Sequence, residues 1–536
     1  MATRNLPVLF GLIFVMAGKA QPVGTFVKSF DPNPQNMFIA DKATNVWSID
    51  NYIYVVNGFL DMQDNRRQQL LKINGSTLEI EKKIEMDGPQ GDIAITEFGG
   101  GYFLTSDNHI LLTGEWRDYN NTRMRTFMAK LDKDLEVVWI NYYPDLFEYH
   151  VFGEAIAEMP SGDIMLYLTE GKSLPTGNPW HSAESWIRMV KTDALGNPIF
   201  SKVVPDTFAQ TVGYGHMSRA EDGTYLVSSQ VIGYYFHPIF GTYRNNAILH
   251  KLDENADPIW SRMINYCKYA RQEPTATALP GSGGAVMWSR DTFTTDPNIA
   301  FEFNELHRFD SEGNTLWTHE WNDVSVRYVY CITTAANGDI LGCGAFQQNA
   351  DRGKTWLFRM SSDGDLLWER HYSDSIQRPW SPGLEMLDLC EMADGRIAAT
   401  GLVFDTSAIG TLNVNIGLLV LGADGCLEPN CSGLNQYITG TYQAIIKNAP
   451  LPQMICWPNP ASSIVKVELP KTPGSTQNKQ VLRCYDAQGK LMAQINWESA
   501  VSAQLIDVNH WPTGIYQVLF FEKGRALFSG KFLVQH

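Results

Sequence analysis

The sequence predicts an all-β protein: a seven-bladed β-propeller followed by a small immunoglobulin-like β-sandwich. Three observations support this fold class. A turn-and-tryptophan pattern recurs along the chain, a hairpin turn precedes each copy, and the pattern stops before a C-terminal segment of alternating apolar strands. The composition agrees, because 12% aromatic residues, 44 glycines and only 19% charged residues in 536 positions are typical of short strands joined by tight turns.

The recurring unit begins with a turn-closing residue, usually Asp, and places an aromatic residue seven positions later. Asp132 precedes Trp139 in this way, and Asp253 precedes Trp260. An Asp or Ser side chain can hydrogen-bond the turn backbone, and a glycine three residues later tolerates a left-handed conformation. We expect the repeated Trp residues to pack between blades. The anchors lie at positions 74, 132, 193, 253, 310, 361 and 422, one every ~50–60 residues.

A two-residue turn such as Asp222-Gly223 opens an apolar strand before each anchor. Each repeat therefore contains two hairpins, and four antiparallel strands suit a propeller blade better than a solenoid repeat. The seventh copy ends at Cys426 without its Trp strand, whereas Phe26 and Phe30 have the spacing of the missing aromatic pair. We expect residues 26–30 to complete the last blade, because an unfinished sheet would keep an open edge.

The segment from Asp310 to Trp317 reads Asp-Ser-Glu-Gly-Asn-Thr-Leu-Trp. It resembles the repeats of secreted bacterial propellers and, more distantly, those of pyrroloquinoline-quinone propellers. The quinone-type repeat carries a Thr before its Gly, and every copy in this chain lacks that Thr. No quinone or other cofactor is therefore expected.

The first 20 residues have the pattern of a secretory signal peptide. Arg4 precedes an apolar run over residues 6–16, and the small residues Gly18 and Ala20 suit a cleavage site. The run is too short to cross a bilayer, and no later segment is long and apolar enough to do so. The expected domains are a signal peptide at 1–20, the propeller at 21–431, a linker at 432–452 and the sandwich at 453–536.

Eight cysteines are compatible with an oxidising compartment. Only Cys426 and Cys431 are close enough in sequence to suggest a local disulfide. A metal site is the alternative for this pair, but it is a poor one because no second Cys or His pair lies nearby, and no metal is expected.

The C-terminal segment contains a Pro-Asn-Pro opening, a Tyr-Asp-Ala-Gln-Gly-Lys strand and turn, and a Gly-Ile-Tyr strand. In this order at the end of the chain, these motifs resemble the C-terminal sorting domain (type A) of the type IX secretion system of Bacteroidetes. The resemblance implies export to the periplasm, recognition by an outer-membrane translocon, and cleavage by a sortase-like protease. It implies a protein that is released or held at the cell surface. The motif residues are Pro458, Asn459, Pro460, Gly489, Gly514 and Tyr516.

The net charge of 42 − 58 = −16 disfavours nucleic acid and anionic membranes as partners. In a propeller, the connections between second and third strands and those between blades emerge on one face, which is the default binding surface. Aromatic residues beside His and Arg on these connections suit a glycan, peptide or protein ligand. The candidate contacts are Trp116, Trp180, His181, Tyr234, Tyr235, His237, His216, Arg271 and Trp380.

The chain has no nucleophile elbow, no His-Glu-x-x-His sequence and no phosphate-binding loop. His150, His216, Glu154 and Glu273 are candidates to converge at the channel mouth as acid, base or metal groups. Two function classes remain. The residues favour a surface-displayed or secreted binding propeller that is not an enzyme. The alternative is a secreted polysaccharide hydrolase or lyase.

Overall fold

The computed structural model describes residues 26–30, 42–60, 66–86, 94–95, 101–118, 123–143, 146–172, 184–205, 211–233, 244–267, 274–293, 300–321, 326–348, 351–374, 384–405, 413–427, 431, 435–438, 454–469, 480–486, 491–497, 503–522 and 525–536. Every regular element within these ranges is a β-strand. The chain forms two compact units, one with strands β1–β30 and the other with strands β31–β37.

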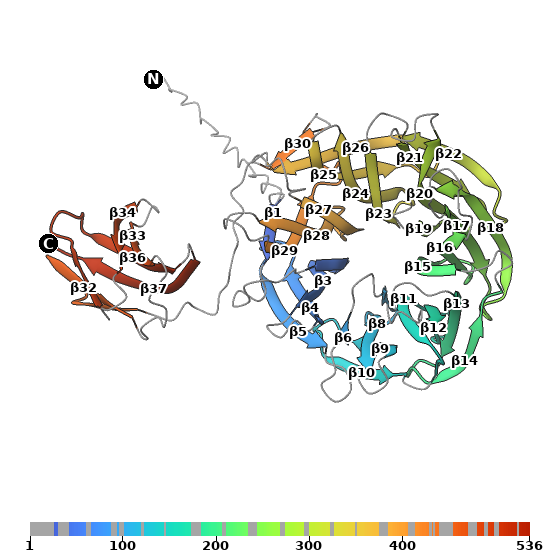
Figure 1. Cartoon of the computed structure of the whole chain (residues 1–536), viewed down its shortest axis with the longest axis horizontal. Coiled ribbons are helices and arrows are strands. Elements are labelled where there is room, and N and C mark those ends of the chain that lie inside the picture. The colour runs from blue at the N-terminus through green and yellow to red at the C-terminus, as the bar shows by residue number, and fades with distance from the viewer. Residues whose placement is uncertain are drawn as a thin grey trace, which may run out of the picture. The chain divides into compact units, whose positions relative to one another are not determined.

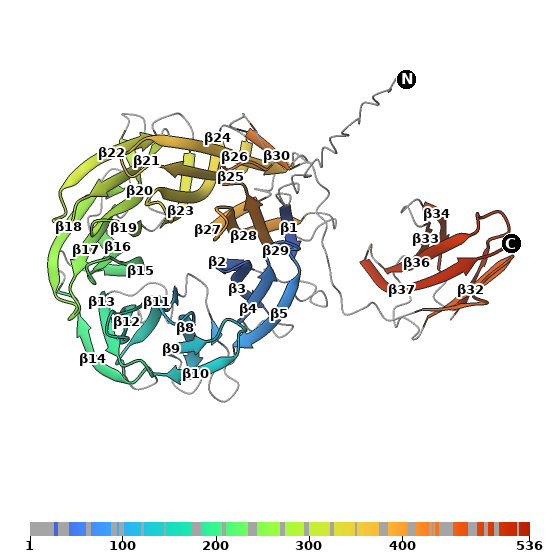
Figure 2. The ribbon, with the colours of Figure 1, turned by 180° about the vertical axis from the view of Figure 1, so that it is seen from behind.

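The first unit is a β-propeller, in which seven antiparallel sheets surround a central axis (Figures 1 and 2). In each blade the first strand lies innermost and the last lies at the rim. The first blade contains β2 (Lys42–Ile49), β3 (Tyr52–Leu60), β4 (Arg66–Asn74) and β5 (Ile80–Met86). In the second blade two short inner strands both pair with β8: its strands are β6 (Ala94–Ile95), β7 (Tyr102–Leu104), β8 (Ile110–Asp118), β9 (Arg123–Leu131) and β10 (Val137–Tyr142).

The next four blades repeat the four-stranded meander. The third contains β11 (His150–Glu158), β12 (Ile164–Lys172), β13 (Glu184–Thr192) and β14 (Pro198–Val203). The fourth contains β15 (Thr211–Arg219), β16 (Tyr225–Gly233), β17 (Arg244–Leu252) and β18 (Pro258–Cys267). The fifth contains β19 (Thr275–Leu279), β20 (Gly283–Phe293), β21 (Ala300–Phe309) and β22 (Thr315–Trp321). The sixth contains β23 (Val326–Thr334), β24 (Ile340–Gln348), β25 (Asp351–Met360) and β26 (Leu366–Asp374).

The seventh blade joins the two ends of the propeller sequence. Its three inner strands are β27 (Leu384–Glu391), β28 (Ile397–Asp405) and β29 (Asn413–Leu421). The rim strand is β1 (Phe26–Phe30), which pairs antiparallel with β29, Phe26 opposite Val420 and Phe30 opposite Ile416. The expected N-terminal strand is therefore present, and the inner strand β2 of the first blade packs against β27. These contacts close the ring.

Part of the expected linker belongs to the propeller. Within residues 432–452, β30 (Asn435–Ile438) pairs in parallel with the rim strand β26 of the sixth blade, Asn435 opposite His371. The sequence suggested only a connector here, because four residues of mixed polarity carry no clear strand pattern. Pairing covers backbone groups that the rim strand would otherwise leave open at the sheet edge.

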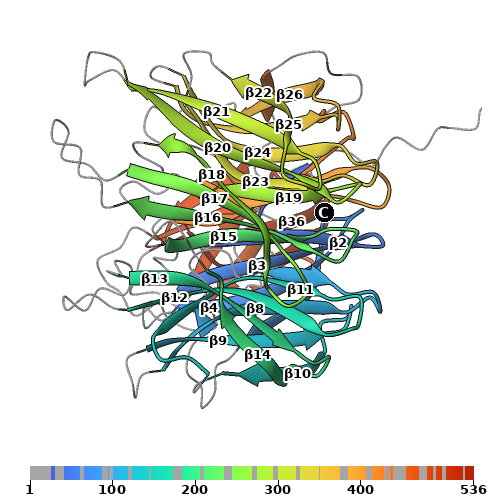
Figure 3. The ribbon, with the colours of Figure 1, turned by 90° about the vertical axis from the view of Figure 1, so that its right-hand side faces the viewer.

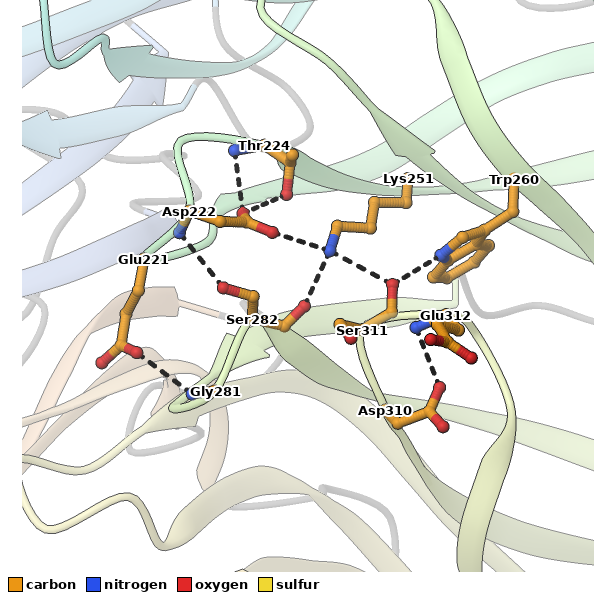
Figure 4. Close-up of polar contacts among 10 residues, drawn as sticks. All are labelled: Glu221, Asp222, Thr224, Lys251, Trp260, Gly281, Ser282, Asp310, Ser311 and Glu312. Carbon is orange, nitrogen blue, oxygen red and sulfur yellow. Dashed lines mark hydrogen bonds and ion pairs between the residues drawn. The ribbon is translucent and has the colours of Figure 1, made fainter.

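The repeated Trp residues pack between blades, as the sequence predicts. The indole nitrogen of Trp260 donates to the backbone oxygen of Ser311 in the next blade, at 3.0 Å (Figure 4). Its ring lies against Gly313, where a Cβ atom would be 2.9 Å from the indole and where φ is +81°. Trp317 and Trp368 make the same contacts with the turns of the following blades. At Gly313, Gly364 and Gly425 the glycine thus serves both the turn conformation and the neighbouring Trp.

The second unit is a two-sheet sandwich. One sheet contains β31 (Ile455–Trp457), β32 (Ile464–Glu468) and β35 (Ala503–Asp507). The other contains β34 (Leu491–Asn496), β33 (Gln480–Tyr485), β36 (Gly514–Glu522) and β37 (Arg525–Val534) in that spatial order. Alternate residues such as Val465, Val467, Val518 and Phe520 point inward and form one apolar core.

Candidate functional site

The strands of the propeller run between its two faces, which the side view in Figure 3 shows. Because each blade is an antiparallel meander, the strand ends that lead from the second to the third strand and from one blade to the next all lie on one face. The tight hairpin turns and the anchor turns lie on the opposite face. We call these the long-connection face and the short-turn face.

Most of the predicted ligand contacts are on the long connections. Seven of the nine lie outside the described residues: Trp180, His181, Tyr234, Tyr235, His237, Arg271 and Trp380. Glu273, the fourth of the predicted acid–base candidates, also lies outside them. Their use as contacts stays a prediction.

Trp116 is not a surface residue. It belongs to strand β8, is only 5% exposed, and packs edge-on against Tyr142 with ring centroids 6.0 Å apart. The sequence reading placed it in the connection after the strand, but the strand continues to Asp118 and the alternation of its side chains turns Trp116 into the core.

His216 lies in the inner strand β15 of the fourth blade and is half-buried. Burial lowers its pKa to about 4, so the imidazole is neutral at physiological pH. A neutral imidazole can accept and donate one hydrogen bond each, but it supplies no charge to a ligand. His150 begins β11, and its Nδ1 accepts the backbone N–H of Met124 at 3.1 Å.

Two buried carboxyl groups interact where the second and third blades meet. Glu115 is in β8, Glu154 is in the inner strand β11, and both are almost fully buried. Burial raises the pKa of Glu115 well above its usual range, and the charge of Glu154 adds to this, while the N–H of Gly153 opposes it. Such a carboxyl group can hold a proton at neutral pH. The sequence-based prediction did not include Glu115. The signal that could have found it is an acid that continues the apolar strand Ile-Leu-Leu-Thr-Gly-Glu.

A third buried acid joins the last blade to the first. Asp388 in β27 accepts the backbone N–H groups of Val46 at 2.8 Å and Leu389 at 2.9 Å. Burial raises its pKa to about 6. Hydrogen bonds from Cys331 and from these two N–H groups lower the pKa and so oppose part of this effect. Its partners are backbone and core groups, so this carboxylate serves ring closure.

No three His, Cys, Asp or Glu side chains of the described ranges are arranged to hold a metal ion. Cys426 and Cys431 form a disulfide bond. In the part of the chain that the structure describes, no helix has the length and apolarity needed to span a membrane.

The Pro-Asn-Pro segment of the sandwich clamps the last strand of the chain. The side-chain oxygen of Asn459 accepts the N–H of Leu533 at 2.8 Å, and its amide nitrogen donates to the backbone oxygen of Lys531 at 3.4 Å. Ala461 continues the contact through backbone hydrogen bonds to Leu533 and Gln535. The segment thus fixes the C-terminal strand β37. Gly489 lies outside the described residues.

Tyr516 anchors the same strand from the other side. Its ring stacks on Phe532 with centroids 5.8 Å apart, and its hydroxyl donates to the backbone oxygen of Pro512 at 2.7 Å. Gly514 begins β36, the strand that carries Tyr516. The motif residues that the structure describes therefore converge on the C-terminal strand and its neighbour.

Residues 456–535 match the family model of the secretion system C-terminal sorting domain. The chain carries an export signal of this family. The sorting domain and the propeller fold together describe a propeller protein that is secreted or attached to the cell surface.

Several solved structures are similar to the chain at low identity. One is a protein of unknown function from Dyadobacter fermentans, with 10% identity, a TM-score of 0.40, and coverage of 74% of this chain and 98% of that one. Another is the GH93 alpha-L-arabinofuranosidase of Fusarium graminearum, with 9% identity, a TM-score of 0.38, and coverage of 74% and 97%. The Dos1 propeller has 12% identity, a TM-score of 0.36, and coverage of 72% and 78%. No curated protein matches the chain.

Proposed function

We propose that the sorting domain directs this chain through a type IX secretion system, and that the propeller then binds a glycan, peptide or protein outside the cell through its long-connection face. The route runs through the periplasm, and a translocon and a sortase-like protease act on the C-terminal domain. The observation that carries the export proposal is an exposed apolar face on the sorting domain.

This face is the outer side of the sheet β31–β32–β35. Trp457, Lys466 and Leu505 are cross-strand neighbours on it, with Trp457 52% and Leu505 60% exposed. Ile455 and Ile464 extend the apolar surface on the same side, while Val465 and Val467 face inward. The Lys466 ammonium lies 5.2 Å from the centre of the Trp457 ring. An exposed apolar surface of this kind is typical of a protein docking site.

Cell fractionation tests the route. Deletion of residues 453–536 is expected to leave the propeller in the periplasm. The double variant Trp457→Ser/Leu505→Ser is expected to do the same while the sandwich still folds, because both side chains lie outside its core. Leu491→Ser, at an exposed position on the other sheet, is the matched control and is expected to be exported normally. Surface delivery of the deletion variant would refute the sorting assignment, and delivery of the double variant alone would refute only the docking face.

Ligand binding by the propeller is supported by its connections. The sequence between the strand ends of this face is rich in Trp, Tyr, His and Arg, and loops on a folded scaffold are the usual carriers of recognition. A glycan array with the purified full-length protein tests this directly. A double variant Trp180→Ala/Trp380→Ala is expected to lose the signals that the wild-type protein gives. Unchanged binding by that variant would mean that the ligand does not bind at Trp180 or Trp380.

The buried pair Glu115 and Glu154 favours the alternative, a polysaccharide hydrolase or lyase, because a carboxyl group that keeps its proton can act as a general acid. A screen of polysaccharides for released reducing ends or unsaturated products tests it. Activity that is lost in Glu115→Gln would establish the enzyme, whereas its absence on all polysaccharides supports the binding function.

A further inference from the structure

A cation on the third strand of several blades pairs with an acid in the hairpin turn of the same blade. The cation lies two residues before the anchor, and the acid lies at one of two positions in the turn between the first and second strands. Nitrogen–oxygen distances are 2.7–3.2 Å. The pairs are Lys130 with Asp107, Lys191 with Asp163, Lys251 with Asp222, and Arg359 with Asp339.

The fourth blade shows how the pair is built (Figure 4). The ammonium of Lys251 is buried and donates to Asp222 at 2.9 Å, and to the backbone oxygens of Ser282 at 3.0 Å and Ser311 at 3.2 Å in the fifth blade. Hydrogen bonds from the turn residue Thr224 orient the carboxylate of Asp222. A buried cation is thus neutralised by an acid of its own blade.

The fifth blade keeps the cation and lacks the acid. Arg308 occupies the position of Lys251, but both acid positions of the turn are glycines, Gly281 and Gly283. The side chain of Arg308 is only 8% exposed and forms no ion pair with any residue that the structure describes. Burial lowers its pKa below the usual value, while the charge of Asp310 acts to raise it. A buried guanidinium without a directly paired anion is costly, so its retention points to a partner from outside.

The guanidinium has two N–H groups to spare. Its Nη1 donates to the backbone oxygens of Gly284 and Phe309, and its Nη2 donates once, at a long 3.4 Å, to that of Pro280. The Nε–H has no acceptor. Because Nη2 donates to only one acceptor among the described residues, it keeps an N–H for a charge-assisted hydrogen bond, which a carboxylate suits.

A cavity of about 350 Å³ adjoins Arg308 on the short-turn face, between the fifth and sixth blades. Trp317, Leu316 and Pro280 give it apolar walls, and Asp363 lies on the wall formed by the next anchor turn. The acid of Asp363 is exposed and makes no ion pair with Arg308. Its negative charge disfavours ligands with a second negative group nearby.

We propose that this cavity binds the carboxylate of a small extracellular molecule, which takes the place of the missing turn acid and pairs with Arg308. The apolar walls accommodate the body of the molecule, and Asp363 restricts the site to ligands with one carboxylate. A uronic acid sugar and a simple aliphatic acid both have this chemistry. The site lies on the face opposite the one proposed for glycan, peptide or protein binding, so each proposal can be tested independently of the other.

Calorimetric titration of the full-length protein tests the site with three probes: glucuronate, propionate and neutral glucose. Glucuronate or propionate is expected to bind with a Kd of about 1 mM or tighter, and glucose is not expected to bind. Equal affinity for the two acids would mean that the site reads the carboxylate alone, whereas binding of glucuronate alone would identify a sugar acid. Failure of both acids to bind would overturn the proposal.

Two variants at Gly281 supply a matched pair. A Cβ atom at Gly281 meets no other atom within 4 Å, so Gly281→Asp adds an acid at the turn position that corresponds to Asp222 of the fourth blade. Gly281→Asn has the same shape and the same backbone cost at φ +79° without the charge. Gly281→Asp is expected to abolish acid binding and to melt at a higher temperature than Gly281→Asn, which retains binding.

Arg308→Gln is expected to weaken acid binding by about tenfold or more, because the charge-assisted hydrogen bonds are lost. Undiminished binding in Arg308→Gln, or in Gly281→Asp, would overturn the proposal. If Arg308→Gln fails to fold, the Gly281 pair still decides, because neither substitution removes a core side chain.

Discussion

The propeller and the sorting sandwich bury charge differently. Every buried charged side chain of the described residues belongs to the propeller, where acids and cations meet at hairpin turns and blade boundaries. The sandwich core is apolar, and the buried polar side chain there, among the residues described, is Gln480. In the propeller, turns and strand ends of neighbouring blades approach one another, and their peptide groups need partners. In the sandwich the core consists of apolar side chains from two sheets, so apolar burial suffices there.

The largest expected effect is in the sandwich core. Phe520→Ala removes a fully buried ring that packs edge-on against Trp497, with centroids 5.3 Å apart, and is expected to cost about 3–5 kcal/mol of that unit's free energy of unfolding. Scanning calorimetry should show one transition shifted and the propeller transition unchanged. Ile515→Ala, at an exposed position, is the control. A shift of both transitions would mean that the two units unfold together.

Substitution of one member of an ion pair tests the charged groups at the hairpin turns and blade boundaries of the propeller. Glu170 accepts Arg188 at 2.6 Å and the indole N–H of Trp186 at 2.8 Å. Glu170→Gln leaves the partly buried guanidinium of Arg188 without its buried anion and is expected to destabilise the propeller by about 3 kcal/mol. Asp107→Asn breaks an ion pair whose acid is half exposed and is expected to cost less than about 1 kcal/mol. Equal losses in denaturant titrations would contradict the role of burial.

The raised pKa of Asp388 predicts that the stability of the propeller depends on pH. Its pKa is raised from 3.8 to about 6 in the folded protein, so the folded state holds the proton more tightly than the unfolded chain. The stability that this provides is fully present below the unfolded pKa and is lost as the pH rises through about 6, a difference of roughly 3 kcal/mol at most. Urea titrations at a series of pH values should show a smaller fall in Asp388→Asn than in the wild-type protein. Parallel curves would exclude this residue as the cause.

A smaller effect than that of Asp388 is expected at the contact between Trp and anchor turn. Gly313→Ala and Gly395→Ala both place a side chain at positive φ, but only the former meets a neighbouring indole, since the nearest atom to a Cβ at Gly395 is 4.0 Å away. Thermal unfolding should therefore show Gly313→Ala to be less stable than Gly395→Ala by about 1–2 kcal/mol. A variant pair of equal stability would mean that the indole moves without cost.

The sequence predicts the ring well because its signals are local and repeated. The spacing from Asp253 to Trp260 encodes a turn followed by a strand, and its repetition around the chain leaves few alternatives to a closed propeller. The N-terminal rim strand and the sorting domain follow from the same kind of short pattern. Each of these features depends on residues that are near one another in the sequence.

The sequence alone does not reveal which side chains face inward or which groups meet across a blade boundary. Trp116 has the sequence context of a connection, and only its place in a strand buries it. Glu115 and Glu154 are isolated acids in the sequence and become a coupled pair where two blades pack. Arg308 fits the repeat pattern, and only the packed blade shows a cation whose acid is missing. Secondary structure and repeat number depend on local spacing, whereas burial, pairing and cavities depend on distances between residues far apart in the chain, which only the tertiary structure sets.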